Sequence, residues 1–507
     1  MKNTSDENSI IIIGAGFAGL SAGIYARMNG YNTRIFEMHD KPGGLCTSWS
    51  RKGFTFDGCI HWLVGSSPES AFNKYWEEVG IAQKSRIINF DEYKRFEGKD
   101  GRTVIFYSDV NRLEKHLLEL SPQDTALIRN FTSAIRMCTA FNQPSSRVHF
   151  WERVKRNIKF GLTFVLHGKD MQKWMKTSAR EFSEQFTDPL LREAFTDLWI
   201  PDFSMLFMLF TFAYLHNRNA GYPLGGSMPM SKILEERYTG LGGVINYKKR
   251  VEKIIVENNR AVGIRLTDGS EHRADRIISA ADGHSTIFNM LDGRFVDEKI
   301  REPYEKWPIF NPLIFISLGI NDTFSGEPMT VSGFSFPLNK PEEIGDAVRD
   351  RINIHIYNHD PAMAPEGKTS IIIILNSEYN YWKKLAEDIN AYKSKKEEIA
   401  SKITMILEQR YPDISKKIEV IDVATPLTFE RYTGNWQGSF EGWLITPANS
   451  YVFMKPMSQQ LPGLDNFYMC GQWTEPGGGL PTGIMAGQRL IRKICKEDHR
   501  KFRIIVK

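Results

Sequence analysis

Cysteine is scarce in this sequence, and long apolar runs are absent from it. The chain has 507 residues and five cysteines, too few for a disulfide framework in a chain of this length. Their spacing also lacks the pairs of a zinc site, so we expect no metal. No run reaches the roughly 20 apolar residues of a membrane span; the nearest, Phe203–Leu215, is too short. We therefore expect a protein of a reducing, cytoplasmic compartment.

Leader, repeat and hydrolase motifs are also missing. Residues 1–9 are polar, whereas a signal peptide needs a basic start, an apolar stretch and a small-residue cleavage site. We find no low-complexity tract and no fixed-period repeat. There is no GxSxG elbow and no HExxH metal motif, which argues against the serine-hydrolase and zincin classes. A chain of 507 residues exceeds one hydrophobic core, so two or more domains are expected.

The most informative motif is a glycine-rich turn close to the N-terminus. The apolar run Ser9–Ile13 predicts a buried parallel strand. Residues 14–19 read Gly-Ala-Gly-Phe-Ala-Gly and lead into a helical pattern. In such a motif Gly14 permits the tight turn, Gly16 lets the backbone approach a pyrophosphate, and Gly19 allows close helix–strand packing. The helix N-terminus offers free N–H groups to the phosphates. The motif predicts a dinucleotide-binding fold.

Glu37 ends the second strand at a spacing from which a carboxylate reaches a ribose hydroxyl, but this motif alone does not separate FAD from NAD. Three further features favour FAD: a glycine pair after the second strand, a meander with a returning strand at 245–282, and a glycine-rich segment near the C-terminus. The Gly43-Gly44 pair lets the backbone run close to a long ligand. Near the C-terminus, a strand at 466–471, a glycine-rich loop at 476–483 and a helix at 484–496 would place a helix N-terminus against a flavin. Residues 240–243 lack the spacing of a second fingerprint, so no second nucleotide domain is expected.

The remaining strand patterns suggest an α/β fold. Residues 245–269 predict a small meander, and Arg276–Asp282 predicts a buried strand that returns to the nucleotide-binding domain. We expect a Rossmann-type FAD-binding domain of the glutathione-reductase kind, with an inserted mixed β-sheet and a helical substrate domain. The FAD domain would be discontinuous, with residues 1–65, 223–294 and 451–507. The substrate-binding cap would hold residues 66–222 and 295–450.

Together these motifs resemble the phytoene desaturase family, which includes carotenoid isomerases and retinol saturases. The resemblance covers nearly the whole chain and is strongest at Ile10–Gly65, at Gly225–Asp282, at Asp360-Pro361 with Ala364–Lys368, and at Gly471–Gly487. It implies FAD bound across the N-terminal fingerprint and the C-terminal glycine loop. Carried over by position, the cofactor contacts would be Gly14, Ala15, Gly16, Phe17, Ala18, Gly19, Glu37, Met38, Gly43, Gly44, Leu45, Val251, Gly471, Thr482, Gly483 and Ile484.

The chain departs from the family pattern in two ways. Many relatives have arginine directly after the glycine pair, where this chain has Leu45. The loop Pro476–Gly479 is similar to that of the desaturases, whereas Gly58–Trp62 is similar to the retinol saturases. The direction of the redox reaction is therefore left open.

The inserts between the FAD segments should build the substrate site. The first is mostly helical by period and contains the Met- and Phe-rich run Trp199–Phe212. Such side chains suit a long apolar ligand, and plain core packing explains them equally well. The second insert has β-like runs at Leu313–Leu318 and Ser370–Leu375, which suggest a sheet that covers the flavin. An apolar lipid or polyene is the expected substrate.

A basic segment at 147–176 stands out from the otherwise balanced charge. It carries a net charge of +6, whereas the whole chain carries +5, and aromatic residues are interleaved with the basic ones. This pattern fits a membrane surface with anionic lipids or a solvated basic face. No nucleic-acid motif accompanies it, so we expect no nucleic-acid partner. The sequence does not determine the oligomeric state.

His61 is the first candidate for acid–base chemistry, because it follows the strand and turn that should pass the flavin. A structural histidine is the competing interpretation. Glu475, beside the C-terminal glycine loop, is the second candidate, against a plain surface carboxylate. Asp57 is interpreted as a turn former and Cys59 as a packing residue.

The leading hypothesis is a desaturase or saturase that acts on C–C bonds of a polyene or isoprenoid lipid. A flavin-dependent cis–trans isomerase and a non-catalytic FAD- or lipid-binding protein are the alternatives. An amine oxidase carries less weight, since the apolar insert argues for a lipid.

Overall fold

A computed structural model describes residues 8–139, 168–453 and 457–506 of the chain. Its central sheet is parallel and gathers strands from distant parts of the sequence, in the order β10-β2-β1-β14-β20. These strands are β1 (Ser9–Ile13), β2 (Asn32–Phe36), β10 (Val244–Asn246), β14 (Arg276–Ser279) and β20 (Phe467–Met469). The predicted α/β class is confirmed. β10 was expected in the meander, but its Ile245 pairs with Ile35 of β2 and so extends this sheet.

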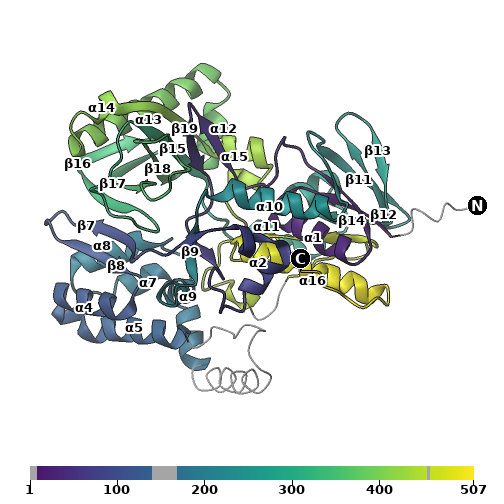
Figure 1. The fold of residues 1–507 in the computed structure, drawn as a ribbon, viewed down its shortest axis with the longest axis horizontal. Helices are drawn as coiled ribbons and strands as arrows, with labels where there is room; N and C mark the ends of the chain where they lie inside the picture. Colours follow the sequence, from purple (N-terminus) through teal and green to yellow (C-terminus); the bar gives the residue numbers. More distant parts are fainter. Residues whose placement is uncertain (1–7, 140–167, 454–456, 507) are drawn as a thin grey trace, which may run out of the picture.

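Both faces of the central sheet are covered, which explains why β1 is a continuous run of isoleucine. Ile10 and Ile12 pack in one hydrophobic cluster with helices, and Ile11 and Ile13 pack in another with a small meander. The helices are α1 (Phe17–Met28), α10 (Ser227–Gly240) and α16 (Leu480–Glu497), and the meander is β11 (Val251–Glu257), β12 (Arg260–Leu266) and β13 (Glu271–Arg273). Figure 1 shows the meander at the right, beside the N-terminus.

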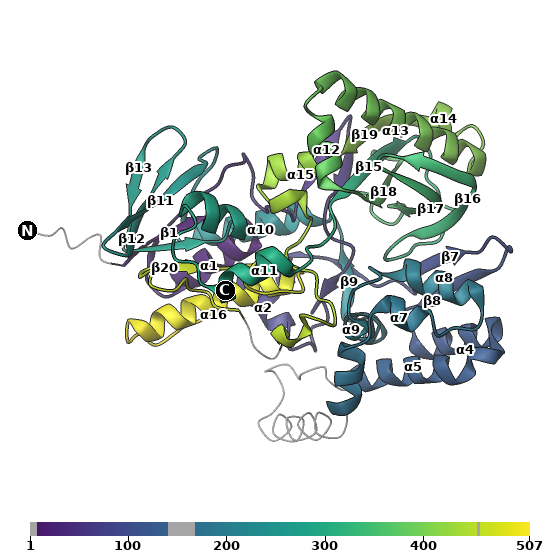
Figure 2. The ribbon, with the colours of Figure 1, turned by 180° about the vertical axis from the view of Figure 1, so that it is seen from behind.

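A second, seven-stranded sheet lies away from the first (Figures 1 and 2). Its order is β19 (Ile418–Ala424), β15 (Leu313–Ile320), β18 (Thr369–Asn376), β17 (Ala347–Ile356), β16 (Phe334–Ile344), β7 (Glu92–Glu97) and β8 (Thr103–Tyr107). Helices α12 (Tyr379–Leu385), α13 (Ile389–Arg410) and α14 (Ile414–Lys417) accompany it. Isoleucines of α13 and β17 share one hydrophobic core. The expected strands of the second insert are thus present.

The first insert combines helices with a hairpin. Its helices include α4 (Val110–Leu120), α5 (Thr125–Thr139), α7 (Ala179–Ser183), α8 (Pro189–Leu198) and α9 (Met205–His216). The period predicted a mostly helical insert, but β7 and β8 form a hairpin that joins the seven-stranded sheet. The helical period could not indicate this hairpin, because β7 is held by a strand far away in the sequence: Arg95 of β7 pairs with Phe334 of β16. The hairpin therefore ties the two inserts together.

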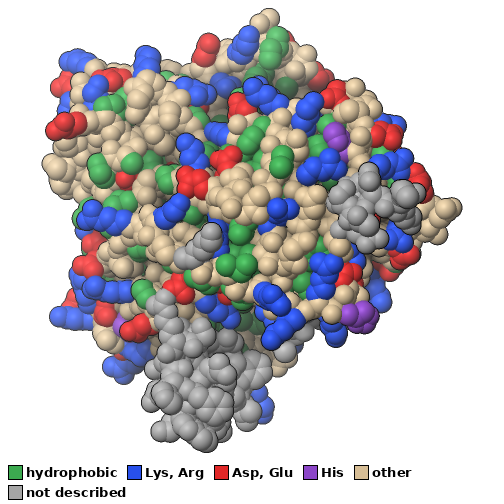
Figure 3. All heavy atoms as spheres, turned by 45° about the vertical axis from the view of Figure 1, so that its right-hand side comes forward, with side chains coloured by type: hydrophobic (Ala, Val, Ile, Leu, Met, Phe, Trp, Pro, Cys, Tyr) green, Lys and Arg blue, Asp and Glu red, His purple; other side chains and the backbone are tan. Residues whose placement is uncertain are grey.

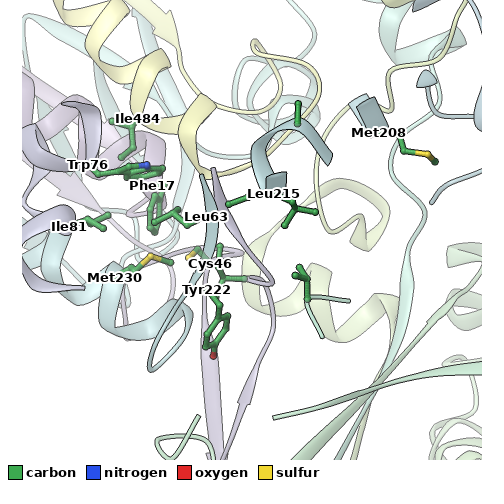
Figure 4. Packing of buried hydrophobic residues seen from close by; sticks show 14 of the residues in the cluster. Phe17, Cys46, Leu63, Trp76, Ile81, Met208, Leu215, Tyr222, Met230 and Ile484 are labelled. Atoms are coloured by element: carbon green, nitrogen blue, oxygen red, sulfur yellow. The ribbon is translucent and has the colours of Figure 1, made fainter. Parts of the chain in front are cut away.

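Short elements connect the sheets. They are β3 (Ser48–Arg51), β4 (Phe54–Asp57), β5 (Leu63–Val64), α2 (Asn73–Val79), α3 (Ile81–Lys84), β6 (Ile87–Ile88), β9 (Ala220–Pro223), α11 (Glu298–Lys306) and α15 (Pro426–Thr433). Figure 4 shows how they pack: Phe17 of α1 and Ile484 of α16 lie near Trp76 of α2 and Leu63 of β5. The segment of the N-terminal glycine motif and the C-terminal segment are thereby joined in one core.

No helix within the described ranges is long and apolar enough to cross a bilayer. On the face in Figure 3, basic and acidic side chains are interspersed, with hydrophobic side chains scattered among them. Most of the basic segment 147–176 lies outside the described residues. Within its described part, Lys169 and Lys173 are exposed, whereas Trp174 is buried against Phe182. The predicted membrane contact stays a prediction.

Candidate functional site

One large cavity lies where the sheets and the helical insert meet. Its volume is about 2070 Å³, and its lining comes from the N-terminal fingerprint, the C-terminal glycine loop and both inserts. Typical small-molecule pockets measure roughly 300–1,000 Å³. The cavity therefore has room for a dinucleotide and a second ligand side by side.

The glycine fingerprint forms one edge of this cavity. Gly14 has a positive φ of 96°, and it and Gly16 line the cavity. Helix α1 begins after Gly16, and within the described residues this N-cap position makes no side-chain cap bond to the first N–H groups. A Cβ added to Gly16 would meet nothing closer than 3.9 Å, so the glycine leaves open space above uncapped N–H donors. That arrangement suits a phosphate group.

Gly19 has the packing role that the motif predicts. A Cβ at this position would lie 2.0 Å from the carbonyl oxygen of Gly14 and 3.2 Å from the Cβ of Ala280. No side chain fits there without a backbone shift. Gly19 therefore lets α1 sit directly on the ends of β1 and β14, behind the cavity rather than in it.

Glu37 lies at the end of β2 and lines the cavity. Its Oε2 accepts a hydrogen bond from the Ala15 N–H (2.7 Å), and its Oε1 accepts one from the His39 N–H (2.8 Å). Each carboxylate oxygen retains a lone pair for another donor. Glu37 thus braces the fingerprint loop and still presents an acceptor where a ribose hydroxyl is expected.

The C-terminal glycine loop closes the same cavity from the other side. Gly471 has a positive φ of 115°, and a Cβ there would lie 3.2 Å from Ala18 Cβ. Helix α16 follows Gly479, which as a glycine N-cap supplies no side-chain cap of its own. Two helix N-termini therefore border one cavity.

The predicted cofactor residues separate into lining and supporting positions. Ala15, Gly19 and Ile484 lie behind the cavity, where Ala15 and Ile484 are fully buried. The residues that line it are Gly14, Gly16, Phe17, Ala18, Glu37, Met38, Gly43, Gly44, Leu45, Val251, Gly471, Thr482 and Gly483. Lys41 and Arg51 also line it, so cations are present although Leu45 replaces the arginine of many relatives. Open glycine edges, free N–H donors and nearby cations fit FAD.

Glu441 is a lining residue that sequence reasoning missed. Its Oε1 accepts a hydrogen bond from the Gly479 N–H (3.1 Å). A Cβ on Gly478 would lie 1.8 Å from Oε2, so only glycine lets this carboxyl approach the loop. Burial raises the pKa of Glu441 to about 7, which suits proton exchange at neutral pH. The loop around Glu441 has no periodicity or motif that could have indicated this role.

Glu475 occupies a different place from the one expected. It forms an ion pair with Arg489 of α16 and is not among the residues that line the cavity. Burial raises the pKa of Glu475. Its acid–base role stays a prediction, and the structure brings Glu441 rather than Glu475 to the cavity.

His61 lines the cavity and contacts a second histidine. Its Nδ1 lies 3.2 Å from Nδ1 of His355, which is buried and stacks on Tyr357. Burial lowers the pKa of His61 to about 4 and that of His355 well below its usual value. Both rings are therefore neutral at pH 7, so in this contact the Nδ1 of one ring carries the hydrogen and the Nδ1 of the other accepts it.

The turn before His61 is held by Asp57. This buried carboxylate accepts hydrogen bonds from the N–H groups of Cys59 and Ile60, both at 2.9 Å, as expected for a turn former. It also accepts hydrogen bonds from the N–H (2.5 Å) and hydroxyl (2.7 Å) of Ser227 at the start of α10. A hydrogen bond with Cys46 and burial raise the pKa of the Cys59 thiol well above its usual value. Cys59 lines the cavity with its thiol protonated, and its interpretation as a packing residue stays a prediction.

An aromatic row connects the glycine loop with the His61 region. A Cβ on Gly477 would lie 3.2 Å from the Phe207 ring. Phe207 stacks on Phe203 (4.4 Å between centroids), Phe203 stacks on Trp199 (6.0 Å), and Trp199 lies 5.7 Å from Trp62, all on the cavity wall. On α9, Phe207 and Phe210 line the cavity, whereas residues such as Met208 are core. The Met- and Phe-rich run therefore contributes both to the cavity wall and to the buried core.

Comparison with known proteins places the chain in a family. Residues 17–494 match the model of the flavin containing amine oxidoreductases. The chain belongs to this family. The match confirms the predicted FAD cofactor and the oxidoreductase class. The matched segment runs from the first residue of α1 into α16, so both glycine edges of the cavity lie within or beside it.

The relatives and solved structures agree with the predicted resemblance. The chain is 24% identical to a lycopene-forming phytoene desaturase of Pseudescherichia vulneris (96% of this chain, 99% of the relative). It is also 24% identical to a chloroplastic prolycopene isomerase of Daucus carota (97% and 82%). Among structures, a putrescine oxidase variant has a TM-score of 0.60 at 14% identity (96% and 99%). An oxidoreductase of Methanosarcina mazei has a TM-score of 0.57 at 16% identity, over 96% of this chain and 100% of that chain. These structures show the shared fold.

Proposed function

We propose that this oxidoreductase acts on a C–C bond of a long polyene, as a desaturase or saturase. The aromatic row of Phe207, Phe203, Trp199 and Trp62 carries the proposal. It offers a continuous apolar wall that begins at the C-terminal glycine loop, where the flavin ring is expected. Flat aromatic faces suit the flat π-system of a polyene. The chain is similar over most of its length to relatives named phytoene desaturase and prolycopene isomerase, and this similarity also supports the proposal.

Bound FAD supplies hydride transfer at its N5 atom. The residues of the chain then have three tasks: to hold the cofactor, to align the polyene, and to handle one proton. The fingerprint and the C-terminal loop would hold FAD through backbone N–H groups. The aromatic row would align the chain of double bonds and exclude water from the reacting carbon atoms.

Glu441 is the proposed proton-handling group. It lines the cavity beside Gly478 and Gly479, and a pKa of about 7 lets it accept or donate a proton at neutral pH. His61 lies at the Trp62 end of the row, and its lowered pKa keeps the ring neutral. We propose that His61 and His355, as a neutral hydrogen-bonded pair, form part of the wall of the substrate cavity.

A cis–trans isomerase of the same substrate class is the second candidate. Its support is the similarity to the prolycopene isomerase of Daucus carota, which extends over 97% of this chain. The two candidates share a cavity and a cofactor, and they differ in the mass of the product.

The test is to incubate the FAD-loaded protein without oxygen with phytoene, lycopene isomers and a set of primary amines. Product masses are then recorded with an electron acceptor or donor present. A polyene product that differs by two hydrogens supports a desaturase or saturase. An unchanged mass with altered double-bond geometry supports the isomerase. Turnover of amines alone would overturn the proposal.

A further inference from the structure

Two of the five cysteines lie opposite each other at the open end of the hairpin formed by β3 and β4. The N–H of Gly58 donates to the carbonyl of Thr47 (3.0 Å), which extends the antiparallel register of these strands past its last ladder pair. The next residues in this register are Cys46 and Cys59. Since Gly58 and Thr47 are hydrogen-bonded, the cysteines occupy the alternate kind of position, in which opposite Cα atoms lie about 4.5 Å apart and the side chains are close.

The two thiols contact each other. A hydrogen bond with Cys46 is the first cause that raises the pKa of the Cys59 thiol, ahead of burial. Both thiols are free, Cys46 buried and Cys59 half-buried. A disulfide joins Cα atoms that are roughly 4.4–6.8 Å apart, and opposite residues of a hairpin meet this range. The hairpin therefore holds a dithiol that can close to a disulfide with little movement of the backbone.

The dithiol lies at the cavity, beside the N-terminal glycine motif. Both cysteines are lining residues. Cys46 comes directly after the segment Gly43–Leu45, and its N–H donates to the Gly43 carbonyl (3.1 Å). Gly43 in turn forms a β-bridge with Gly16, the residue before α1. The thiol of Cys46 thus stands on the loop whose glycines should lie along the cofactor.

The other thiol is close to the C-terminal glycine loop. The carboxyl group of Glu441 acts electrostatically on the Cys59 thiol, so these two groups are neighbours. The same carboxyl group accepts the hydrogen bond from the N–H of Gly479. The dithiol therefore lies between the two glycine edges that border the expected place of FAD, and it has a proton acceptor beside it.

We propose that Cys46 and Cys59 form a redox-active dithiol that exchanges two electrons with the bound flavin. When the pair is oxidised, two S–H bonds break and one S–S bond forms, so two electrons and two protons leave the thiols. The pair gives both electrons and one proton to the oxidised flavin, and it gives the other proton to the Glu441 carboxylate. In the reverse direction the disulfide takes two electrons from a reduced flavin.

A soluble thiol or disulfide would then reset the pair by thiol–disulfide exchange. The half-buried position of Cys59 on the cavity wall makes it the sulfur that such a reagent reaches first. The dithiol would thus connect the flavin with the thiols of the surrounding compartment. The inference rests on the FAD cofactor and requires no particular substrate.

The first test counts the electrons that the protein takes up. FAD-loaded protein is oxidised with diamide, freed of the reagent and titrated with dithionite without oxygen, while the visible flavin bands are recorded. The wild type should consume about four electrons per flavin, two for the flavin and two for the disulfide, whereas Cys46→Ser and Cys59→Ser should each consume about two. Mass spectrometry of the oxidised wild type should show a peptide that links Cys46 to Cys59, lighter by about 2 Da than the two reduced peptides together.

The second test shows whether the pair exchanges electrons with the flavin. Dithiothreitol reduces the disulfide, so without oxygen it should bleach the flavin of the wild type at least about tenfold faster than that of either serine variant. Cys470→Ser is the matched control, because Cys470 also lines the cavity but its thiol lies 3.9 Å from the Ala18 carbonyl oxygen rather than against a second thiol. This control should behave as the wild type in both tests.

The visible flavin spectrum reports whether each variant is folded and loaded, and the two serine variants give independent evidence. Uptake of only two electrons by the wild type would overturn the inference, and so would bleaching by dithiothreitol that is equally fast in the serine variants. Neither result bears on the polyene proposal, since no polyene is present in these tests. A protein that takes up no FAD would overturn both proposals.

Discussion

Replacing Gly16 by alanine should separate cofactor binding from folding. The backbone at Gly16 is ordinary, with φ of −70° and ψ of 176°. An added Cβ would meet no atom closer than 3.9 Å. The folded apoprotein should therefore accept Gly16→Ala with a stability change within about 1 kcal/mol.

The same methyl group would occupy the space that a pyrophosphate needs above the start of α1. If it displaces one charge-assisted hydrogen bond, the loss is about 1.5–3 kcal/mol. That corresponds to FAD binding weaker by roughly 10- to 150-fold. Titration of apoprotein with FAD, followed by quenching of flavin fluorescence, measures this change directly.

Gly19→Ala is the matched comparison within the same motif. Its Cβ would lie 2.0 Å from the Gly14 carbonyl oxygen, so the backbone must move at a cost of about 3 kcal/mol or more. This variant should unfold at a clearly lower temperature even without FAD. A Gly16→Ala variant that binds FAD as tightly as the wild type, or that is as unstable as Gly19→Ala, would refute this prediction.

Two further predictions concern pH. Burial raises the pKa of Glu441 from 4.5 to about 7, so the stability that its neutral form contributes is complete below pH 4.5 and declines as the pH rises through 7. The free energy of unfolding of Glu441→Gln should therefore rise relative to that of the wild type, by about 1–3 kcal/mol between pH 4.5 and 8. Denaturant titrations measure this difference, and parallel pH profiles for the two proteins would contradict it. Burial lowers the pKa of His61 from 6.5 to about 4, so its contribution is present above pH 6.5 and lost as the pH falls to 4. His61→Asn should accordingly show less acid destabilisation than the wild type over that range, and an unchanged acid profile would count against a buried neutral ring.

The nucleotide-binding edge could be predicted from the sequence because its signals are local. Strand β1, the glycine turn and α1 are consecutive, and the spacing of Gly14, Gly16 and Gly19 has direct steric meaning. The hairpin of β7 and β8 was missed because its partner β16 is far away in sequence. Short strands inside a helical pattern give little periodic signal.

The acid group at the cavity could not be found in this way. Glu475 stands beside the glycine loop in sequence, but it pairs with Arg489, whereas Glu441 reaches the loop through the fold. Adjacency in sequence does not determine the direction of a loop side chain. Strand β17 is different, since polar residues alternate with isoleucines from Arg351 to Ile356, and this visible pattern could have indicated a strand between a core and a cavity.

The most direct test of the account is an anaerobic single turnover with FAD-loaded protein and a polyene. The visible flavin bands and the mass of the polyene are recorded together. The bound flavin should change redox state in step with a polyene that gains or loses two hydrogens. The contradicting result is a bound flavin whose visible spectrum no polyene changes, whether the flavin starts oxidised or reduced, but which a primary amine bleaches.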